Sequence, residues 1–291
     1  MKPEAYQKRY EAYVSLIEPA LTKALEGRLA PLQQSMAYSL LAGGKRLRPV
    51  LTLACCDLLG GSVEEAVPFA AAVEMIHAYS LIHDDLPCMD DDDLRRGKPT
   101  NHKVFGEAVA VLSGDGLQSL AYETMLSQGY NENAWKAARA VAQGAGSMGM
   151  VSGQVRDMQA TGQEVSAETL QKIHAEKTGA LILAACLAGA YMAGAKAQDI
   201  ESITGYAKAL GLAFQIADDI LDVTSTAEEL GKTPGKDEKE HKTTYVSLYG
   251  VERAQQLAEQ AAEQAQQALV RFGKKTEFLS ITAQKAVKRR K

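Results

Sequence analysis

The chain has 291 residues, of which 46% are hydrophobic and 23% are charged, and its formal net charge is −4. This length allows one or two domains with a sizeable core, and the composition is that of a globular protein. The small negative charge argues against a general nucleic-acid-binding protein.

Cysteine usage and the N-terminal segment both indicate a cytoplasmic protein. The four cysteines include no CxxC pair, so we expect reduced thiols. The segment MKPEAYQKRYEAY carries charges but no apolar signal core, so we expect no export sequence. The longest apolar run, residues 179–195, falls short of the roughly 20 residues that a membrane span needs. We therefore expect a tightly packed core helix there and no membrane span.

The distribution of proline indicates the fold class. No proline occurs between Pro99 and Pro234, a region rich in Ala, Leu, Glu and Gln. Alternating β-branched runs bounded by turn pairs are nearly absent. A long proline-free stretch with apolar residues at helical spacing predicts helices. We expect an all-α chain that forms a single large helical bundle, with one domain over residues 1–291.

Two helices are expected first, over residues 5–27 and 32–42. Lys45, Arg46 and Arg48 follow at the junction with a third helix. Cations at such a junction suit an anion, because the backbone N–H groups at a helix start point in the same direction. A basic surface turn is the alternative.

Ser62 followed by Glu65 is a capping-box pattern, which predicts a helix from about residue 63 to Leu86. His77 and Asp84 are seven residues apart and share one face of that helix. A lone histidine on a helix is more often a core or surface residue than a ligand.

The end of this helix carries an unusual concentration of acid. Within residues 84–93, DDLPCMDDDD, six of ten side chains are carboxylates. Their repulsion calls for a counter-charge, and Mg²⁺ typically takes one or two carboxylates while keeping waters and substrate phosphates as its other ligands. Arg95 and Arg96 add planar guanidinium groups suited to phosphate oxygens. The stretch therefore indicates a metal bound together with a phosphorylated substrate, with a solvated acidic loop as the alternative.

Gly97 predicts a turn, after which residues 102–126 resume a helix. Gly114 inside that helix indicates a close helix contact or a kink. Asn133 is expected to cap a helix that begins at Ala134.

The segment before the long apolar run contains several polar side chains. Gln154 and Asp157 are expected near the functional site, without an assigned chemical role. Lys177 and Thr178 immediately precede the apolar helix 179–195. A lysine in such a position is usually a surface residue whose stem packs on the protein.

A second acidic cluster lies far down the chain, in FQIADDILD. Gln215, Asp218, Asp219 and Asp222 fall at i, i+3, i+4 and i+7 and therefore share one helix face. The residues between them are apolar, and three acids on one face of a buried helix are costly unless they are paired or bind a metal. A satisfied structural network is the alternative, but two aspartate pairs on apolar helices favour a common role.

The last third of the chain begins with ELGKTPGKDEKEHKTTY, which contains Lys232, Lys236 and Lys242. A lysine-bearing loop rich in Gly and Pro is suited to close over a diphosphate, although a plain surface loop has the same composition. A polar helix is expected over residues 251–271. The basic tail, residues 272–291, is expected to be a frayed end.

Six motifs together resemble those of the trans-isoprenyl diphosphate synthases. They are GGKRLRP at 43–49, SLIHDDLPCMDDDDLRRGKPT at 80–100, GQVRDM at 153–158, EKTGAL at 176–181, FQIADDILD at 214–222 and GKTPGKD at 231–237. The resemblance runs from about Leu40 to Gly250, and the six motifs in this order are highly specific. Bacterial farnesyl diphosphate synthase is the most similar branch, with geranylgeranyl diphosphate synthase nearby.

The resemblance implies a bundle of the isoprenoid synthase type with a central cavity, and a homodimer. It implies two to three Mg²⁺ ions, or Mn²⁺, bound by Asp84, Asp85, Asp90, Asp218, Asp219 and Asp222. It assigns isopentenyl diphosphate to Lys45, Arg48, His77 and Arg96, and the allylic diphosphate to Arg95, Lys177 and Lys232. It places Thr178 and Gln215 beside the reacting carbons, where they act together with Lys177.

The implied reaction joins isopentenyl diphosphate head-to-tail to dimethylallyl or geranyl diphosphate. The allylic diphosphate leaves, the double bond of isopentenyl diphosphate attacks, and a proton is lost. Tyr79 and Ser80 lie just before Asp84. In this family, large side chains at this level form the floor of the pocket that holds the growing prenyl chain. Together with the two extra residues in the DDxxxxD spacing, they favour the fifteen-carbon product, farnesyl diphosphate. Geranyl and geranylgeranyl diphosphate are the alternatives.

Two other kinds of protein share some of these features. A terpene cyclase combines an all-α fold with a first aspartate motif, but its second motif normally contains Asn, Ser and Glu ligands. The second motif here is DDILD, and GGKRLRP would have no purpose without a second diphosphate. An inactive partner subunit of a prenyl synthase usually loses one acidic cluster, and both are intact here.

Overall fold

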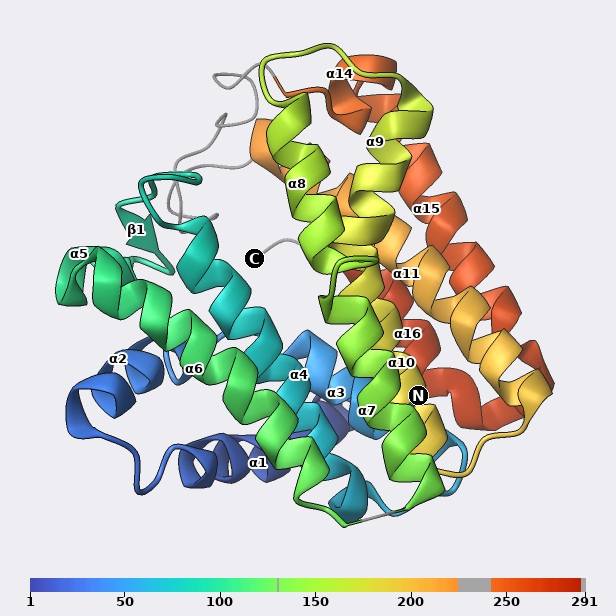
Figure 1. Cartoon of the computed structure of the whole chain (residues 1–291). Coiled ribbons are helices and arrows are strands. Elements are labelled where there is room, and N and C mark those ends of the chain that lie inside the picture. The colour runs from blue at the N-terminus through green and yellow to red at the C-terminus, as the bar shows by residue number, and fades with distance from the viewer. Residues whose placement is uncertain (130, 225–241, 289–291) are drawn as a thin grey trace. The chain divides into compact units, whose positions relative to one another are not determined.

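The computed structural model describes residues 1–129, 131–224 and 242–288. Apart from one two-stranded hairpin, the regular structure in these ranges is helical (Figure 1), which confirms the predicted all-α class. Contacts between α-carbons divide the chain into two compact units. The N-terminal unit contains residues 2–142 and 188–194, and the C-terminal unit contains Met1, 143–187 and 195–291. That the whole chain forms one domain stays a prediction.

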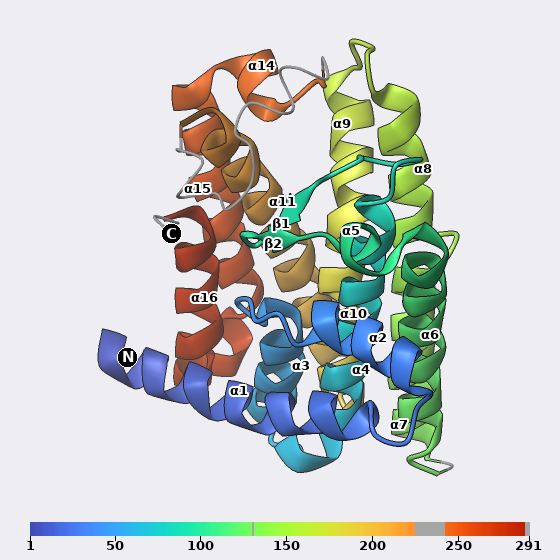
Figure 2. The ribbon, with the colours of Figure 1, turned by 90° about the vertical axis from the view of Figure 1, so that its left-hand side faces the viewer.

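The N-terminal unit contains the first aspartate motif. Its elements are α1 (Pro3–Ala24), α2 (Ala30–Leu40), α3 (Leu47–Leu58), α4 (Val63–Asp84), β1 (Leu94–Arg95), β2 (Lys98–Pro99), α5 (Asn101–Phe105), α6 (Glu107–Leu126) and most of α7 (Glu132–Ala145). Helix α4 packs against α3 and α6, and α1 lies across α3 and α4 (Figure 2).

Helix α4 is the central helix of this unit because it is apolar on all sides, as a fully buried helix must be. Phe69, Val73 and Ile76 are completely buried within it. Its start is fixed as predicted, since the Ser62 side chain accepts a hydrogen bond from the Glu65 backbone N–H at 3.2 Å. The helix ends at Asp84, the first residue of the acidic motif.

Helix α6 packs directly against α4, which confirms the close contact predicted at Gly114. A Cβ at that position would lie 2.0 Å from Nε2 of His83, so any larger residue would force the His83 ring to move. The predicted helix 102–126 is interrupted, however. Gly106 has a φ of 83°, which lies outside the helical region, and it therefore separates α5 from α6. Glycine adopts this conformation readily because it has no Cβ.

The C-terminal unit contains the second aspartate motif. Its elements are α8 (Met150–Ala160), α9 (Ala167–His174), the π-helical turn η1 (Ala175–Gly179), most of α10 (Ala180–Met192), α11 (Ala197–Thr224), α14 (Tyr245–Tyr249), α15 (Val251–Ala268), the 3₁₀ segment η2 (Val270–Thr276) and α16 (Glu277–Val287). Helices α11 and α16 both pack along α15 (Figure 2).

The apolar run of α10 is densely packed, as predicted. Leu181, Ile182 and Cys186 are completely buried. Within the described ranges, one stretch, Ala167–Met192, matches a membrane span in length and apolar composition. Half of its most apolar window is buried inside the protein, and the core helices of many proteins pass the same test.

The prediction of a frayed C-terminus is wrong for residues 277–287, which form the helix α16. Phe278, Leu279 and Ala283 lie on its buried side, and the Tyr206 hydroxyl donates a hydrogen bond to the Leu279 carbonyl at 3.0 Å. The apolar residues of this helix form a short amphipathic pattern, which the basic residues around it made hard to recognise in the sequence.

The cap predicted at Asn133 is also wrong. The Asn131 side chain accepts hydrogen bonds from the backbone N–H groups of Asn133 and Ala134 in the first helical turn of α7.

Arg46, one of the three cations at the α2–α3 junction, is a structural residue. Its side chain is 1% exposed and forms ion pairs with Glu74 and Glu18, both at 2.8 Å. It also donates to the Leu40 carbonyl at the end of α2. These bonds satisfy its guanidinium inside the protein, so Arg46 does not contribute to an anion site at this junction.

Replacing Arg46 with Met should lower the free energy of unfolding by about 3–5 kcal/mol, because it leaves the carboxylate of Glu74 buried without its cation. The double variant Arg46→Met/Glu74→Leu should recover most of that loss. Lys45→Met, at an exposed neighbouring position, should change stability by less than about 0.5 kcal/mol. Urea unfolding followed by circular dichroism measures all three; equal losses for Arg46→Met and Lys45→Met would contradict this assignment.

Candidate active site

The first aspartate motif forms a tight turn at the end of α4. The Asp90 N–H donates to the Asp84 carbonyl at 2.9 Å, and the Met89 and Asp91 N–H groups both donate to the Leu86 carbonyl. Asp91 has a φ of 46°, in the left-handed region that a non-glycine residue rarely adopts. The turn therefore returns the chain, so that the backbone of Asp90 lies against the backbone of Asp84.

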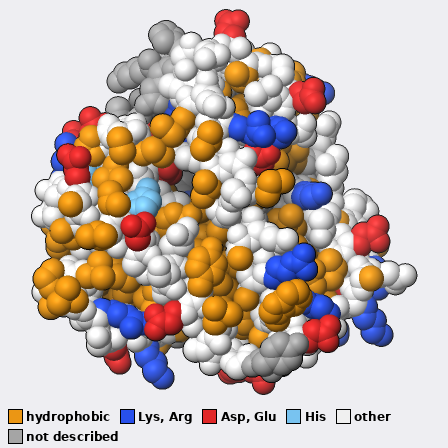
Figure 3. Space-filling model, viewed as in Figure 1, with side chains coloured by type: hydrophobic (Ala, Val, Ile, Leu, Met, Phe, Trp, Pro, Cys, Tyr) orange, Lys and Arg blue, Asp and Glu red, His pale blue; other side chains and the backbone are white. Residues whose placement is uncertain are grey.

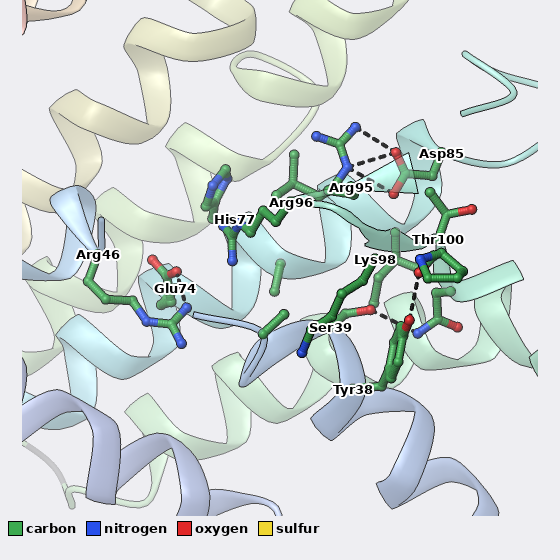
Figure 4. Close-up of a pocket in the computed structure, with 16 residues that line it drawn as sticks. Tyr38, Ser39, Arg46, Glu74, His77, Asp85, Arg95, Arg96, Lys98 and Thr100 are labelled. Carbon is green, nitrogen blue, oxygen red and sulfur yellow. Dashed lines mark hydrogen bonds and ion pairs between the residues drawn. The ribbon is translucent and has the colours of Figure 1, made fainter. Parts of the chain in front are cut away.

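Asp85 is paired with Arg95 (Figure 4). The Arg95 Nε lies 2.8 and 2.9 Å from the two carboxylate oxygens, and its Nη2 lies 2.5 Å from Oδ1. The Asp85 side chain is 4% exposed. Burial raises the pKa of the Asp85 carboxyl, Arg95 opposes that rise, and the nearby carboxylates of Asp92 and Asp90 add to it. Asp85 is therefore a buried carboxylate that Arg95 holds inside an acidic cluster.

The β1–β2 hairpin places Arg95 and Arg96, and it was not predicted as a pair of strands. Each strand has two residues, too few for an alternating pattern in the sequence. The hairpin is closed by Thr100, whose N–H donates to the Asp93 carbonyl and whose hydroxyl donates to the Asp92 carbonyl. Arg96 at the turn has a φ of 54°.

Three of the four residues predicted to bind isopentenyl diphosphate lie in the same part of the N-terminal unit. Arg48 Nη1 lies 3.4 Å from Nε2 of His77. The Arg96 guanidinium donates to the Gly43 carbonyl and covers Gly44, where a Cβ would lie 2.8 Å from its Cζ. Burial and four neighbouring arginines, Arg48 first among them, hold the pKa of His77 well below its usual value, so this imidazole is neutral at pH 7.

Beside these residues is a cavity of about 40 Å³, which is large enough to hold water (Figure 4). Its polar lining includes Arg46, Glu74, His77, Asp85, Arg95, Arg96 and Lys98. Lys45, the fourth predicted residue, is exposed, and its backbone carbonyl accepts a hydrogen bond from the Tyr10 hydroxyl.

Tyr79 and His83 are adjacent aromatic rings on the face of α4 that α6 covers. Their centroids are 5.7 Å apart in an edge-to-face arrangement. Tyr79 is 6% exposed, and burial raises the pKa of its hydroxyl to about 12. Ser80 is partly buried, and its hydroxyl donates to the His77 carbonyl. The rings fill the space just before the first aspartate of the motif.

The second aspartate motif lies on α11, with its acids on the predicted face. Asp219 and Asp222 are 6% and 7% exposed, whereas Gln215 and Asp218 are partly buried. Asp219 Oδ2 accepts a hydrogen bond from the Tyr245 backbone N–H at 2.8 Å. Asp222 Oδ1 is buried and has no hydrogen-bond partner among the residues that the structure describes. A buried carboxylate oxygen in this state is costly unless a cation binds it.

His174 adds a residue to this site that the sequence did not reveal. Its Nε2 lies 4.0 Å from Asp219 Oδ1, and its ring stacks on Tyr245 with centroids 5.6 Å apart. Burial lowers the pKa of His174 to about 4, so the ring is neutral at pH 7. A lone histidine on a short helix gives no signal of such a role, because its neighbours come from distant parts of the chain.

Lys177 and Thr178 lie in η1, a π-helical turn between α9 and α10. Such turns are rare and often occur at functional sites. The Lys177 Nζ is 2.7 Å from Oδ2 of Asp157 on α8, and Lys242 Nζ is 3.8 Å from the same oxygen. The predictions for Lys232 and Lys236 lie outside the described residues.

The donors present fit Mg²⁺ bound together with a substrate diphosphate. Within the described ranges, no three Asp, Glu, His or Cys side chains gather closely enough to hold a metal ion by themselves. Mg²⁺ keeps several waters and commonly uses only one or two carboxylates plus substrate phosphates. The buried Asp222 Oδ1, which has no hydrogen-bond partner among the described residues, favours an added cation.

Known proteins with similar sequences and structures agree with these features. The chain is 47% identical over 272 residues to the chloroplastic geranylgeranyl pyrophosphate synthase of Capsicum annuum, covering 90% of this chain and 74% of the relative. It is 45% identical over 277 residues to the dimethylallyltranstransferase of Fischerella ambigua, covering 94% and 79%. A crystal structure of an FPP/GFPP synthase from Zymomonas mobilis superimposes with a TM-score of 0.87 at 36% identity, covering 97% and 99%.

Those likenesses confirm the isoprenoid synthase type of fold. The model of one family, Polyprenyl synthetase, matches residues 30–280, a range that includes both aspartate motifs, the GGKRLRP junction and Lys177. The chain belongs to the polyprenyl synthetase family.

Proposed function

We propose that this protein condenses isopentenyl diphosphate with an allylic diphosphate, and that its main product is farnesyl diphosphate. The observation that carries the proposal is the pair of aspartate motifs, each beside a set of cations in its own unit. Arg95 and Arg96 accompany the first motif, and Lys177 and Lys242 lie near the second. Carboxylates for a metal together with cations for phosphate suit a diphosphate substrate better than any other class.

Asp84, Asp90 and Asp222 would hold Mg²⁺, with Asp218 and Asp219 completing the second motif. Asp85 supports the site in another way, because both of its oxygens face Arg95 and fix the direction of that guanidinium. When bound, Mg²⁺ supplies positive charge that neutralises a leaving diphosphate. Mn²⁺ has the same preference for oxygen ligands.

Arg95 and Lys177 stabilise the negative charge that develops on the allylic diphosphate as its C–O bond breaks. Both side chains are held in advance by carboxylates, Arg95 by Asp85 and Lys177 by Asp157. Cations oriented beforehand lower the barrier because no reorganisation is needed during the reaction. The hydroxyl of Thr178 and the amide of Gln215 stabilise the allylic cation without capturing it.

Arg48, His77 and Arg96 hold isopentenyl diphosphate, with Lys45 reaching from the exposed junction. The Arg96 guanidinium lies over Gly44 beside the cavity of about 40 Å³, where it would meet a bound diphosphate. The neutral His77 contributes a hydrogen bond rather than a charge. No side chain in this region stands out as a base, so the released diphosphate is the group that removes the proton.

Tyr79 supports a fifteen-carbon product. Its buried ring and that of His83 fill the α4–α6 contact directly before Asp84, which leaves little depth for a longer chain. Geranylgeranyl diphosphate is the second candidate, and it is favoured by the identity of this chain to the Capsicum annuum enzyme.

We also propose a cytoplasmic homodimer. Exposed apolar side chains lie along α5 and α6, among them Val104, Val111, Leu112 and Leu126. Apolar side chains gather on the corresponding part of the surface (Figure 3). A second copy that covers this face would remove it from water.

Replacing Asp84 with Ala should reduce turnover of isopentenyl and geranyl diphosphate by at least about 100-fold, because a metal carboxylate is lost. The helical circular dichroism should be unchanged. Asp93→Ala is the matched control, since Asp93 belongs to the same acidic run but is exposed and pairs with Lys103 at 2.7 Å. Full activity of Asp84→Ala would refute the metal assignment.

Product length is tested by chromatography of the reaction products after phosphatase treatment. The native protein should release mainly farnesol, and Tyr79→Ala should shift the product to twenty carbons or more, because it deepens the pocket before Asp84. Tyr13→Ala, which removes the same volume from a buried site on α1, should leave product length unchanged. Mainly geranylgeraniol from the native protein would favour the second candidate instead.

A further inference from the structure

Asp157 on α8 is the point at which two lysines from distant parts of the chain meet. Its Oδ2 lies 2.7 Å from the Nζ of Lys177 in η1 and 3.8 Å from the Nζ of Lys242, near the start of α14. All three side chains are largely buried, with exposures of 19%, 26% and 17%. One carboxylate therefore brings two ammonium groups close together inside the C-terminal unit.

The backbone of α8 is fixed against η1, one helical turn before Asp157. A Cβ on Gly153 would lie 2.0 Å from the Lys177 backbone nitrogen, so only glycine allows this approach. On the same side, Arg156 and Ser152 both bond to Glu176, at 2.7 and 3.2 Å. The distance between Asp157 and Lys177 is thus set by a rigid contact and not by a flexible loop.

Asp157 is charged at the point where the two lysines meet. Burial acts to raise the pKa of Asp157, but Lys177 foremost and then Lys242 and His174 lower it overall, so the carboxylate is ionised at pH 7. Its negative charge offsets the repulsion between the two ammonium groups and so allows them to lie close together.

We propose that Asp157 is a positioning residue that gathers Lys177 and Lys242 into a pair able to bind the diphosphate of the allylic substrate. This inference rests on the proposed function and assigns a role to a residue that touches the lysines and not the substrate. The pair is assembled before the substrate arrives, so binding does not have to bring the two cations together. A lysine that no carboxylate holds would lose more side-chain conformational entropy when it binds the diphosphate than a lysine already held by Asp157.

The test compares binding of inorganic pyrophosphate with Mg²⁺ to the full-length protein and its variants by isothermal titration calorimetry. Asp157→Asn keeps the shape of the side chain but removes its charge. It should raise the Kd by about tenfold, the loss expected for a hydrogen bond to a charged group. In turnover, it should raise the KM for geranyl diphosphate and leave the KM for isopentenyl diphosphate unchanged. Asp157→Glu, which keeps the charge, should recover most of the affinity.

Glu176→Gln is the matched control. It also neutralises a carboxylate that links α8 to η1, but the described partners of that carboxylate are Arg156 and Ser152 rather than the lysines. Its Kd should equal that of the native protein. An equal rise for Glu176→Gln would show that Asp157 acts only as a link between two elements. Unchanged binding by Asp157→Asn would show that the carboxylate does not position the lysines. Tighter binding would show that it repels the ligand.

A double-mutant cycle distinguishes positioning from general stabilisation. Once Lys177 is replaced by Gln, adding Asp157→Asn should raise the Kd by less than about twofold, because one of the gathered cations is already absent. Fully additive effects would overturn the inference. Failure of the native protein to bind pyrophosphate would contradict the proposed function itself, and this outcome is distinct from the failure of Asp157→Asn to differ from the native protein.

Discussion

Buried carboxylates are the constraint on which the site depends. Asp222 has a carboxylate oxygen that is buried without a hydrogen-bond partner in the described structure, and Asp85 is buried beside two further carboxylates with Arg95 as its cation. Such an arrangement lowers stability in the absence of a ligand. A protein retains it where a cation and an anionic substrate complete the charge balance.

Several residues of the two candidate sites are held in backbone conformations that are uncommon elsewhere. Arg96 and Asp91 have left-handed φ values, and Lys177 lies in a π-helical turn. Residues held in such conformations tend to cluster at functional sites, because the surrounding structure must fix them. Here that surrounding structure is the hairpin in the N-terminal unit and the Gly153 contact in the C-terminal unit. The chemical groups are thus oriented by rigid elements before any substrate binds.

The sequence predicted the helical class, most helix positions and the residues of both acidic motifs, because apolar periodicity and charge spacing are local signals. It did not predict the two-residue strands, the cap at Asn131 or the packing of α16, since each depends on a few residues whose role is decided by distant partners. Arg46 is a case in which the sequence could not distinguish a structural residue from a binding residue. Three adjacent cations looked equivalent, yet contacts with Glu18 and Glu74 give Arg46 a structural role. His174 and Asp157 acquire their neighbours only in the folded chain.

Binding of pyrophosphate with Mg²⁺ tests most directly whether the aspartate motifs take part in binding a diphosphate. The measurement compares the Kd of the native protein with those of Asp90→Asn in the first motif and Asp222→Asn in the second, by isothermal titration calorimetry. Each variant should weaken binding, because each removes a carboxylate that would hold Mg²⁺. A motif whose variant binds pyrophosphate as tightly as the native protein would contradict the account.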